Sequence, residues 1–132
     1  MIVLIYLDSS IVIYLVERHP LYVARIEDAL AKAAGATLVT SRIVDLEVLV
    51  KPLQESRSET VALYRQFLSA TRQLPITDAT FDQALSLRVA YRLKTPDALH
   101  LALAQQHGCE RFWTNDDRLA KAAIGLQIDV LN

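Results

Sequence analysis

The sequence contains few of the residues from which several common kinds of site are built. Among its 132 residues there is one cysteine, Cys109, and there are three glycines. A single cysteine excludes an internal disulfide and a cysteine-rich zinc site, and it fits a reducing compartment. We expect Cys109 to be a small buried hydrophobe. The glycines lie at expected helix ends or turns, so no glycine-rich loop for a dinucleotide or a P-loop phosphate is expected.

The chain also lacks an excess of either charge and a long hydrophobic run. Fourteen Lys and Arg residues stand against fifteen Asp and Glu residues, which gives a net charge of −1. No overall field therefore attracts nucleic acid or a membrane surface, and any polyanion must be held locally. The opening apolar run has no basic leader and ends at Asp8, well short of a membrane span. We expect a soluble, cytoplasmic protein with no membrane contact.

The composition predicts one folded domain over residues 1–132. Hydrophobic residues make up 52% of the chain and charged residues 22%, which excludes disorder. A chain of this length has room for one well-packed core and is too short for two ordinary domains. The apolar content also favours an oligomer or a bound partner.

The stretch from Ile2 to Ser10 organises the rest of the chain. Ile2 to Leu7 is an unbroken apolar run, which is typical of a strand buried on both faces in a parallel sheet. Asp8 would then lie at the carboxyl edge of a central strand, where open α/β sheets bind their ligands. Ser9 and Ser10 are suited to cap the helix that follows.

Helices and short strands alternate along the remaining sequence, with no hairpin signal. This pattern predicts a three-layer α/β/α domain with a central, mainly parallel sheet of short strands. The helix that starts after Ser41 should end near Lys51 and Pro52, because proline interrupts helical hydrogen bonding. The expected helices span residues 11–16, 21–34, 42–51, 58–71, 78–91, 95–108 and 119–123, and the expected extended segments span 2–7, 36–40, 74–76, 111–114 and 126–131, with a turn at Gly125.

Acidic side chains follow or begin several of these elements. Asp8 ends the first strand, Asp97 lies in the first turn of an apolar helix, and Asp116 or Asp117 follows the apolar strand 111–114. Each has an ordinary explanation alone, as a helix cap, a first-turn acid or a turn residue. Together, each at the end of an apolar element, they favour a functional site at one edge of the sheet.

A fourth acid comes from the helix after Ser41. Glu47 lies inside this apolar helix, where an unpaired buried carboxylate would cost several kcal/mol or become protonated. Asp45, two residues earlier, points to nearly the opposite side, so only one of the two can share a pocket with Asp8. We favour Glu47, because Asp45 lies in the first helical turn, where a surface acid is ordinary.

Converging acids would require cations. Two carboxylates about 4 Å apart repel by roughly 4 kcal/mol at an effective dielectric constant of about 20. Oxygen ligands select Mg²⁺ or Mn²⁺, which lower the pKa of a bound water and neutralise the leaving oxygen when a phosphodiester is cut. The chain has no Gly-x-Ser-x-Gly elbow for acyl chemistry, and Ser10 stands where a haloacid-type phosphatase has its second aspartate.

Two further features allow more than one interpretation. His100 lies one turn after Asp97, so it either reaches the site as a positioning or proton-transfer group or is a core histidine with a satisfied hydrogen bond. Residues 83–96 contain Arg88, Arg92 and Lys94 and no acid. This basic strip either holds phosphates or is a solvated helix face.

Four segments of the chain resemble, in order and over almost its whole length, the PIN-domain ribonucleases. The resemblance is closest to the VapC-type toxins of toxin-antitoxin (VapBC) modules. It implies that four acids bind Mg²⁺ or Mn²⁺ for RNA cleavage, and that Ser9 and Thr114 buttress them. The segments are Tyr6–Ser10, Ser41–Leu49, Thr95–Ala102 and Trp113–Asp116, and the acids are Asp8, Glu47, Asp97 and Asp116.

The same resemblance implies partners. They are a cognate antitoxin whose C-terminal tail blocks the acids, and a second toxin copy in a homodimer. We therefore expect a metal-dependent endoribonuclease toxin that inhibits translation by cutting structured RNA. The alternatives are an acid pocket that captures an arginine-bearing peptide without turnover, and a metal-dependent DNA nuclease or phosphatase.

Overall fold

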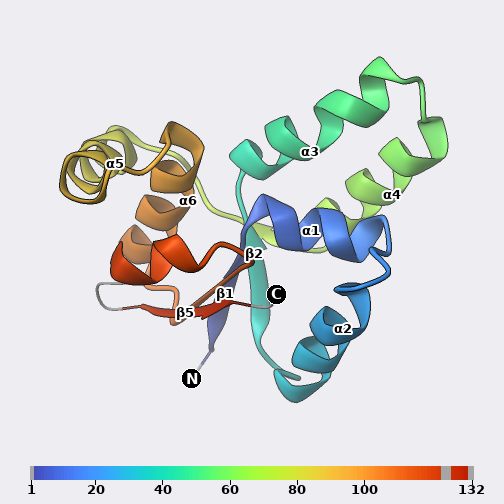
Figure 1. The fold of residues 1–132 in the computed structure, drawn as a ribbon, viewed down its shortest axis with the longest axis horizontal. Coiled ribbons are helices and arrows are strands. Elements are labelled where there is room, and N and C mark those ends of the chain that lie inside the picture. Colours follow the sequence, from blue (N-terminus) through green and yellow to red (C-terminus); the bar gives the residue numbers. More distant parts are fainter. Residues whose placement is uncertain (1, 123–125, 131–132) are drawn as a thin grey trace.

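The computed structural model describes residues 2–122 and 126–130. Within these ranges a parallel sheet lies between two layers of helices (Figure 1). The predicted three-layer α/β/α architecture is therefore confirmed. The turn expected at Gly125 and the ends expected at Ala123 and Leu131 lie outside the described residues. In the described part of the chain, no helix is long and apolar enough to cross a membrane.

Among the described residues the sheet has five strands, and every pairing between them is parallel. Their order is β3-β2-β1-β4-β5, so the first apolar run lies at the centre. The chain leaves β1 towards β2 on one side and later returns to β4 on the other. Such a change of direction opens a crevice at the carboxyl ends of the strands. The strands are β1 (Leu4–Leu7), β2 (Thr37–Thr40), β3 (Arg72–Gln73), β4 (Arg111–Thr114) and β5 (Gln127–Val130).

The helices divide between the two faces of the sheet. The first four cover one face, and the last two, with a short 3-10 helix η1, cover the other (Figure 1). The helices are α1 (Ser9–Val16), α2 (Val23–Lys32), α3 (Arg42–Gln54), α4 (Ser58–Ser69), α5 (Asp78–Tyr91), α6 (Thr95–Gln106) and η1 (Asp117–Ala122).

Alternating side chains of the central strands fill both layers. Tyr6 and Phe112 point to the α5–α6 face, where their rings stack with centroids 5.3 Å apart. Ile5, Leu7 and Trp113 point to the opposite face, into the core formed with α1, α3 and α4. Because a strand presents successive residues to opposite faces, an unbroken apolar run is what a sheet covered on both sides requires.

Several predicted helix features differ from the structure, most of them by one or two residues at a helix end. Asp8, and neither Ser9 nor Ser10, is the N-cap of α1, and its carboxylate accepts from the Ser9 amide, which agrees with the ordinary explanation of Asp8 as a helix cap. The helix α3 continues through Pro52 to Gln54. Pro52 lacks one amide donor, but its φ suits a helix and its ring is buried, which offsets that loss. The helix α2 begins at Val23 rather than at residue 21.

The extended segment predicted at residues 74–76 is also displaced. The strand β3 is formed by Arg72 and Gln73, which pair with Val39 and Thr40 of β2. The amide of Leu74 still donates to the Thr40 carbonyl at 2.9 Å. Residue 75 is proline and has no amide hydrogen, so the ladder cannot continue.

Candidate active site

Asp8 is held firmly at the carboxyl end of the central strand. One carboxylate oxygen accepts from the Ser9 amide at 2.8 Å, and the other accepts from the Thr114 hydroxyl at 2.8 Å. The Asp8 amide in turn donates to the Trp113 carbonyl, which ties the end of β1 to β4. Asp8 is buried, and its two oxygens are fixed by the first residue of α1 and the last residue of β4.

Glu47 reaches the same place from α3. Its Oε1 accepts from the Ser9 hydroxyl at 2.8 Å and from His100 Nε2 at 2.5 Å. Partial burial alone would raise the pKa of Glu47, but the hydrogen bond and charge of His100 and the hydroxyl of Ser9 bring it below its usual value. The carboxylate therefore stays ionised while its side chain is about one-third exposed, at 34%.

A buried chain of hydrogen bonds fixes His100. The Tyr6 hydroxyl lies 2.6 Å from His100 Nδ1 and 2.9 Å from the Ser41 hydroxyl. Burial raises the pKa of Tyr6, so the phenol stays protonated between His100 and Ser41. His100 donates from Nε2 to Glu47, because an ionised carboxylate only accepts. The two interpretations of His100 are both correct in part: it is a buried, satisfied histidine, and it positions Glu47.

Asp97, from the first turn of α6, carries the least compensated charge. No residue that the structure describes donates a hydrogen bond to its carboxylate. Partial burial and the nearby charges of Asp8 and Asp116 raise the pKa of Asp97, and His100 and Arg118 offset part of that rise. A carboxylate in this position favours a bound cation.

Asp116 is paired with an arginine two residues later. The Arg118 guanidinium contacts both oxygens of Asp116, with Nη2 2.5 Å from Oδ2 and Nε 2.9 Å from Oδ1, and the Arg118 amide adds a third donor. This hydrogen bonding lowers the pKa of Asp116. The Asp116 amide donates to the Thr114 hydroxyl, which itself donates to Asp8. Thr114 thus couples two of the four acids.

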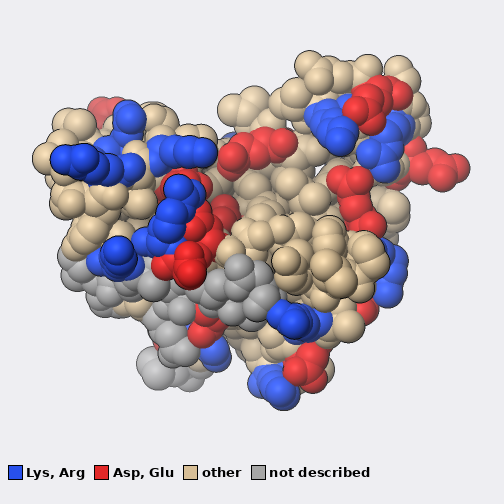
Figure 2. Space-filling view, viewed as in Figure 1, with Lys and Arg blue, Asp and Glu red and all other residues tan. Residues whose placement is uncertain are grey.

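The four acids line one hollow, which we call the acid pocket, of about 310 Å³. Figure 2 shows acidic side chains gathered in the middle of this face, with basic side chains beside them. Within residues 2–122 and 126–130, no three His, Cys, Asp or Glu side chains are arranged as a ready set of metal ligands. Glu47 is turned towards His100, and Asp116 towards Arg118. The pocket is lined by Asp8, Ser9, Ser10, Glu47, Lys94, Pro96, Asp97, Asn115, Asp116 and Arg118.

The two competing acids lie elsewhere. Asp45 accepts from the Gln73 amide group at 2.7 Å and lines a different hollow between α3 and α4. Asp117 begins η1, is exposed, and is absent from the acid pocket. The structure therefore brings Glu47 and Asp116 to Asp8, and leaves their neighbours outside.

Three residues of the site have roles that the sequence did not reveal. Arg118 neutralises Asp116, and Tyr6 orients His100. The Ser10 hydroxyl lines the acid pocket as a buried oxygen with no hydrogen-bond partner among the described residues. Only Tyr6 gave a signal, since a tyrosine in a fully apolar strand needs a partner for its hydroxyl. Cys109 is buried with its pKa raised to about 11, as expected of a structural thiol.

Known proteins share this sequence pattern and this fold. The pattern of the PIN domain family matches residues 5–125. Ribonuclease VapC46 of Mycobacterium tuberculosis (strain ATCC 25618 / H37Rv) is 34% identical over 131 residues, which cover 96% of this chain and 95% of that protein.

Solved structures agree. A chain of a toxin-antitoxin complex from Klebsiella pneumoniae is similar with a TM-score of 0.77 and 25% identity, over 96% of this chain and 97% of that one. The fold also matches VapC20 of Mycobacterium tuberculosis, a Sarcin-Ricin loop cleaving toxin, with a TM-score of 0.73 and 16% identity over 93% and 98% of the two chains. The chain therefore belongs to the PIN domain family, and within it to the VapC ribonucleases.

Proposed function

We propose that this protein is a Mg²⁺- or Mn²⁺-dependent endoribonuclease and the toxin of a type II toxin-antitoxin module. The observation that carries the proposal is the environment of the Asp97 carboxylate. It lines the same hollow as Asp8 and Asp116, whose charges raise its pKa, and no described residue donates a hydrogen bond to it. A divalent cation would relieve this repulsion where the fold itself does not.

The residues of the acid pocket fit such an ion. All four acids offer oxygen, which is the donor that hard divalent cations prefer. The buried Ser10 hydroxyl, without a partner among the described residues, supplies one further polar group for a ligand. We assign the ion to Asp8, Glu47, Asp97 and Asp116, with Arg118 acting as the cation that neutralises Asp116 in its absence.

The chain's own residues would prepare the reaction. When bound, the ion would supply an acidified water and charge neutralisation for phosphodiester hydrolysis. Ser9 and Thr114 hold Asp8 in place, and His100 holds Glu47. Lys94 and Arg118, on the rim of the acid pocket, are placed to bind the phosphate that is cut. The substrate would be a structured RNA of the cytoplasm, and its cleavage would inhibit translation.

An apolar stripe on α3 supports the antitoxin as partner. Leu46, Val50 and Leu53 are exposed by 70%, 45% and 52%, at spacings of four and three residues. Val50 lies one turn after Glu47, so the stripe shares a side of the helix with a proposed ligand. A segment of another protein that packs on this stripe would extend directly to the acid pocket. The antitoxin tail is the occupant that we propose.

The exposed face of α5 supports a homodimer. Phe81, Leu85 and Val89 are exposed by 56%, 63% and 77%, and they recur every four residues. Asp82 lies towards the start of this stripe and Arg88 towards its end, each three residues from Leu85. Two copies packed antiparallel about Leu85 would place the acidic end of one helix beside the basic end of the other. We propose this two-fold contact for the dimer.

The test is RNA cleavage by the purified protein with Mn²⁺ or Mg²⁺ and with EDTA. Asp8→Asn removes a charge with little change in volume and should lower the cleavage rate by roughly 100-fold or more, because it removes a metal ligand. Asp45→Asn and Asp117→Asn are matched controls, since both acids lie outside the acid pocket. Cleavage that persists in EDTA, or equal rates for Asp8→Asn and Asp45→Asn, would overturn the proposal. Parallel assays on DNA and on a phosphomonoester test the alternative substrates.

A further inference from the structure

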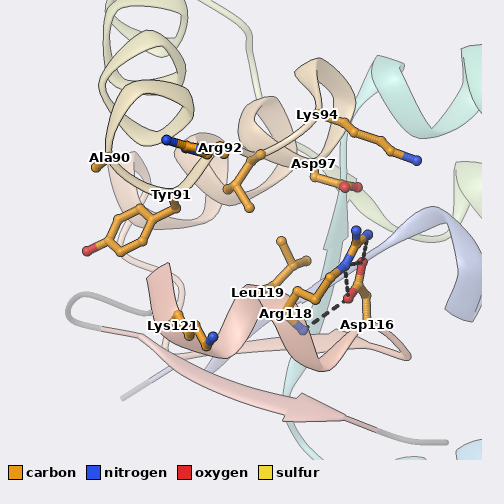
Figure 3. Close-up of a pocket in the computed structure, with 10 residues that line it drawn as sticks. Ala90, Tyr91, Arg92, Lys94, Asp97, Asp116, Arg118, Leu119 and Lys121 are labelled. Carbon is orange, nitrogen blue, oxygen red and sulfur yellow. Dashed lines mark hydrogen bonds and ion pairs between the residues drawn. The ribbon is translucent and has the colours of Figure 1, made fainter.

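A second hollow adjoins the acid pocket. It has a volume of about 470 Å³ and lies between the end of α5, the turn into α6 and the helix η1 (Figure 3). It shares Lys94, Asp97, Asp116 and Arg118 with the acid pocket, so the two hollows are continuous. We call it the side pocket. Its lining residues are Ala90, Tyr91, Arg92, Leu93, Lys94, Asp97, Asp116, Arg118, Leu119 and Lys121.

The floor of the side pocket is apolar and its shape is fixed. Leu93 and Leu119 belong to the buried core, with 9% and 1% exposure. Arg92 ends α5 in the left-handed conformation, with φ of 56°, which turns the chain sharply towards α6. The Arg88 side chain then donates from Nε to the Leu93 carbonyl at 3.1 Å and holds that turn. The pocket is therefore formed before a ligand binds.

The rim of the side pocket is basic. In Figure 3, Asp97 and Asp116 lie at one end, Tyr91 lies at the other, and Leu119 lies between them. Arg92, Lys94 and Lys121 surround this floor. None of these three cations forms an ion pair with a carboxylate that the structure describes. The lining as a whole holds four cations, with Arg118, against the two acids Asp97 and Asp116. In a chain with a net charge of −1, such a local excess of cations indicates an anionic ligand.

We propose that the side pocket binds one unstacked nucleotide of a single-stranded RNA segment, next to the phosphodiester that is cut. The base would lie against Tyr91 and Leu119, and its phosphates would contact Lys94 and Lys121. Proteins recognise single-stranded RNA by this combination of an aromatic surface with a positively charged track. The proposal rests on the proposed function and adds to it a nucleotide subsite.

The test is binding of a fluorescein-labelled single-stranded RNA, measured by anisotropy on the Asp8→Asn protein with Mn²⁺. Lys121→Gln should weaken binding several-fold and reduce the slope of log K against log salt by about 0.7, the value for one phosphate contact on a single strand. Lys32→Gln is the matched control, because Lys32 lies on α2 and pairs with Asp28. It should leave both the affinity and the slope unchanged.

Tyr91 tests the base contact. Tyr91→Ala should weaken binding by roughly 5- to 100-fold, the range for loss of one stacked base, whereas Tyr91→Phe keeps the ring and should bind normally. An RNA that lacks one base should show the same loss of affinity for the wild type when the missing base is the one that contacts Tyr91. For that RNA, Tyr91→Ala should cause no further loss. Thermal unfolding of each variant verifies that it is folded, and Lys121→Gln and Tyr91→Phe leave the core intact.

The outcomes separate the two proposals. If wild-type protein cuts RNA with Mn²⁺ but Lys121→Gln and Tyr91→Ala bind RNA normally, the side pocket is not a nucleotide subsite. Displacement of the RNA by a poly-glutamate peptide as effectively as by unlabelled RNA would also overturn it, in favour of an acidic peptide ligand. If wild-type protein cuts no RNA under any metal condition, the proposed function fails instead.

Discussion

The ionised carboxylate of Asp97 is disfavoured by its surroundings in the folded protein. Burial and the charges of Asp8 and Asp116 raise its pKa, so the folded state favours the protonated form. Its contribution to stability is therefore complete below the unfolded-state pKa of about 3.9 and is lost as the pH rises through the higher folded-state pKa. At neutral pH, the ionised Asp97 destabilises the metal-free protein.

Asp97→Asn should therefore raise the melting temperature at pH 7 in EDTA, by a few degrees for a domain of this size. Mn²⁺ should raise the melting temperature of the wild type and have much less effect on the variant, because the ion relieves the same repulsion. Thermal unfolding followed by circular dichroism measures both, with Asp117→Asn as control. A variant that melts below the wild type in EDTA would contradict this account of Asp97.

At the scale of residues, helix geometry predicted part of the acid pocket, and tertiary contacts determined the rest. The 3.6-residue period of α3 indicated that only one of Glu47 and Asp45 could share a pocket with Asp8, and the first-turn position of Asp45 favoured Glu47. The pairing of Arg118 with Asp116, and the link from Tyr6 through His100 to Glu47, were not predicted. That link joins residues separated by as much as 94 positions in the sequence, and their contact depends on how three elements pack.

At the scale of elements, hydrophobic period located every helix but could not fix their ends. Pro52 was expected to close α3, yet burial of its ring allows two more helical residues. The strand β3 lies at residues 72–73 because β2 offers its partners there, which no local pattern reveals. The sequence also could not tell which apolar residues would be exposed, because the helical period does not show which side of a helix is covered by the rest of the fold.

The stripe on α5 gives a prediction of its own. Leu85→Asp places a charge at the centre of the proposed two-fold contact and should convert the dimer to a monomer, as measured by size exclusion with light scattering. Leu63→Asp on α4, at a residue of similar exposure, should remain dimeric. Asp82→Lys should also weaken the dimer, because it places a positive charge beside the basic end of the other helix. A dimeric Leu85→Asp protein would place the contact elsewhere.

For the whole molecule, the predicted order of elements was sufficient for the fold. Strands buried on both faces and long helices between them leave a parallel sheet as the simple solution, and β1 is its centre as expected. That solution brings the ends of β1 and β4 side by side, and α3 and α6 add their acids from the two layers. The basic strip 83–96 indicated part of the side pocket, through Arg92 and Lys94, but the pocket itself depends on how η1 packs against the end of α5, which the sequence does not show.

The central claim is that this edge of the sheet holds a divalent cation between acids from four elements. Titration calorimetry of the metal-free protein with Mn²⁺ at pH 7 tests it most directly. The account predicts saturable binding by the wild type, binding at least about tenfold weaker for Asp97→Asn, and unchanged binding for Asp45→Asn. A wild type that binds no Mn²⁺, or an Asp97→Asn variant that binds it as tightly, would contradict the account.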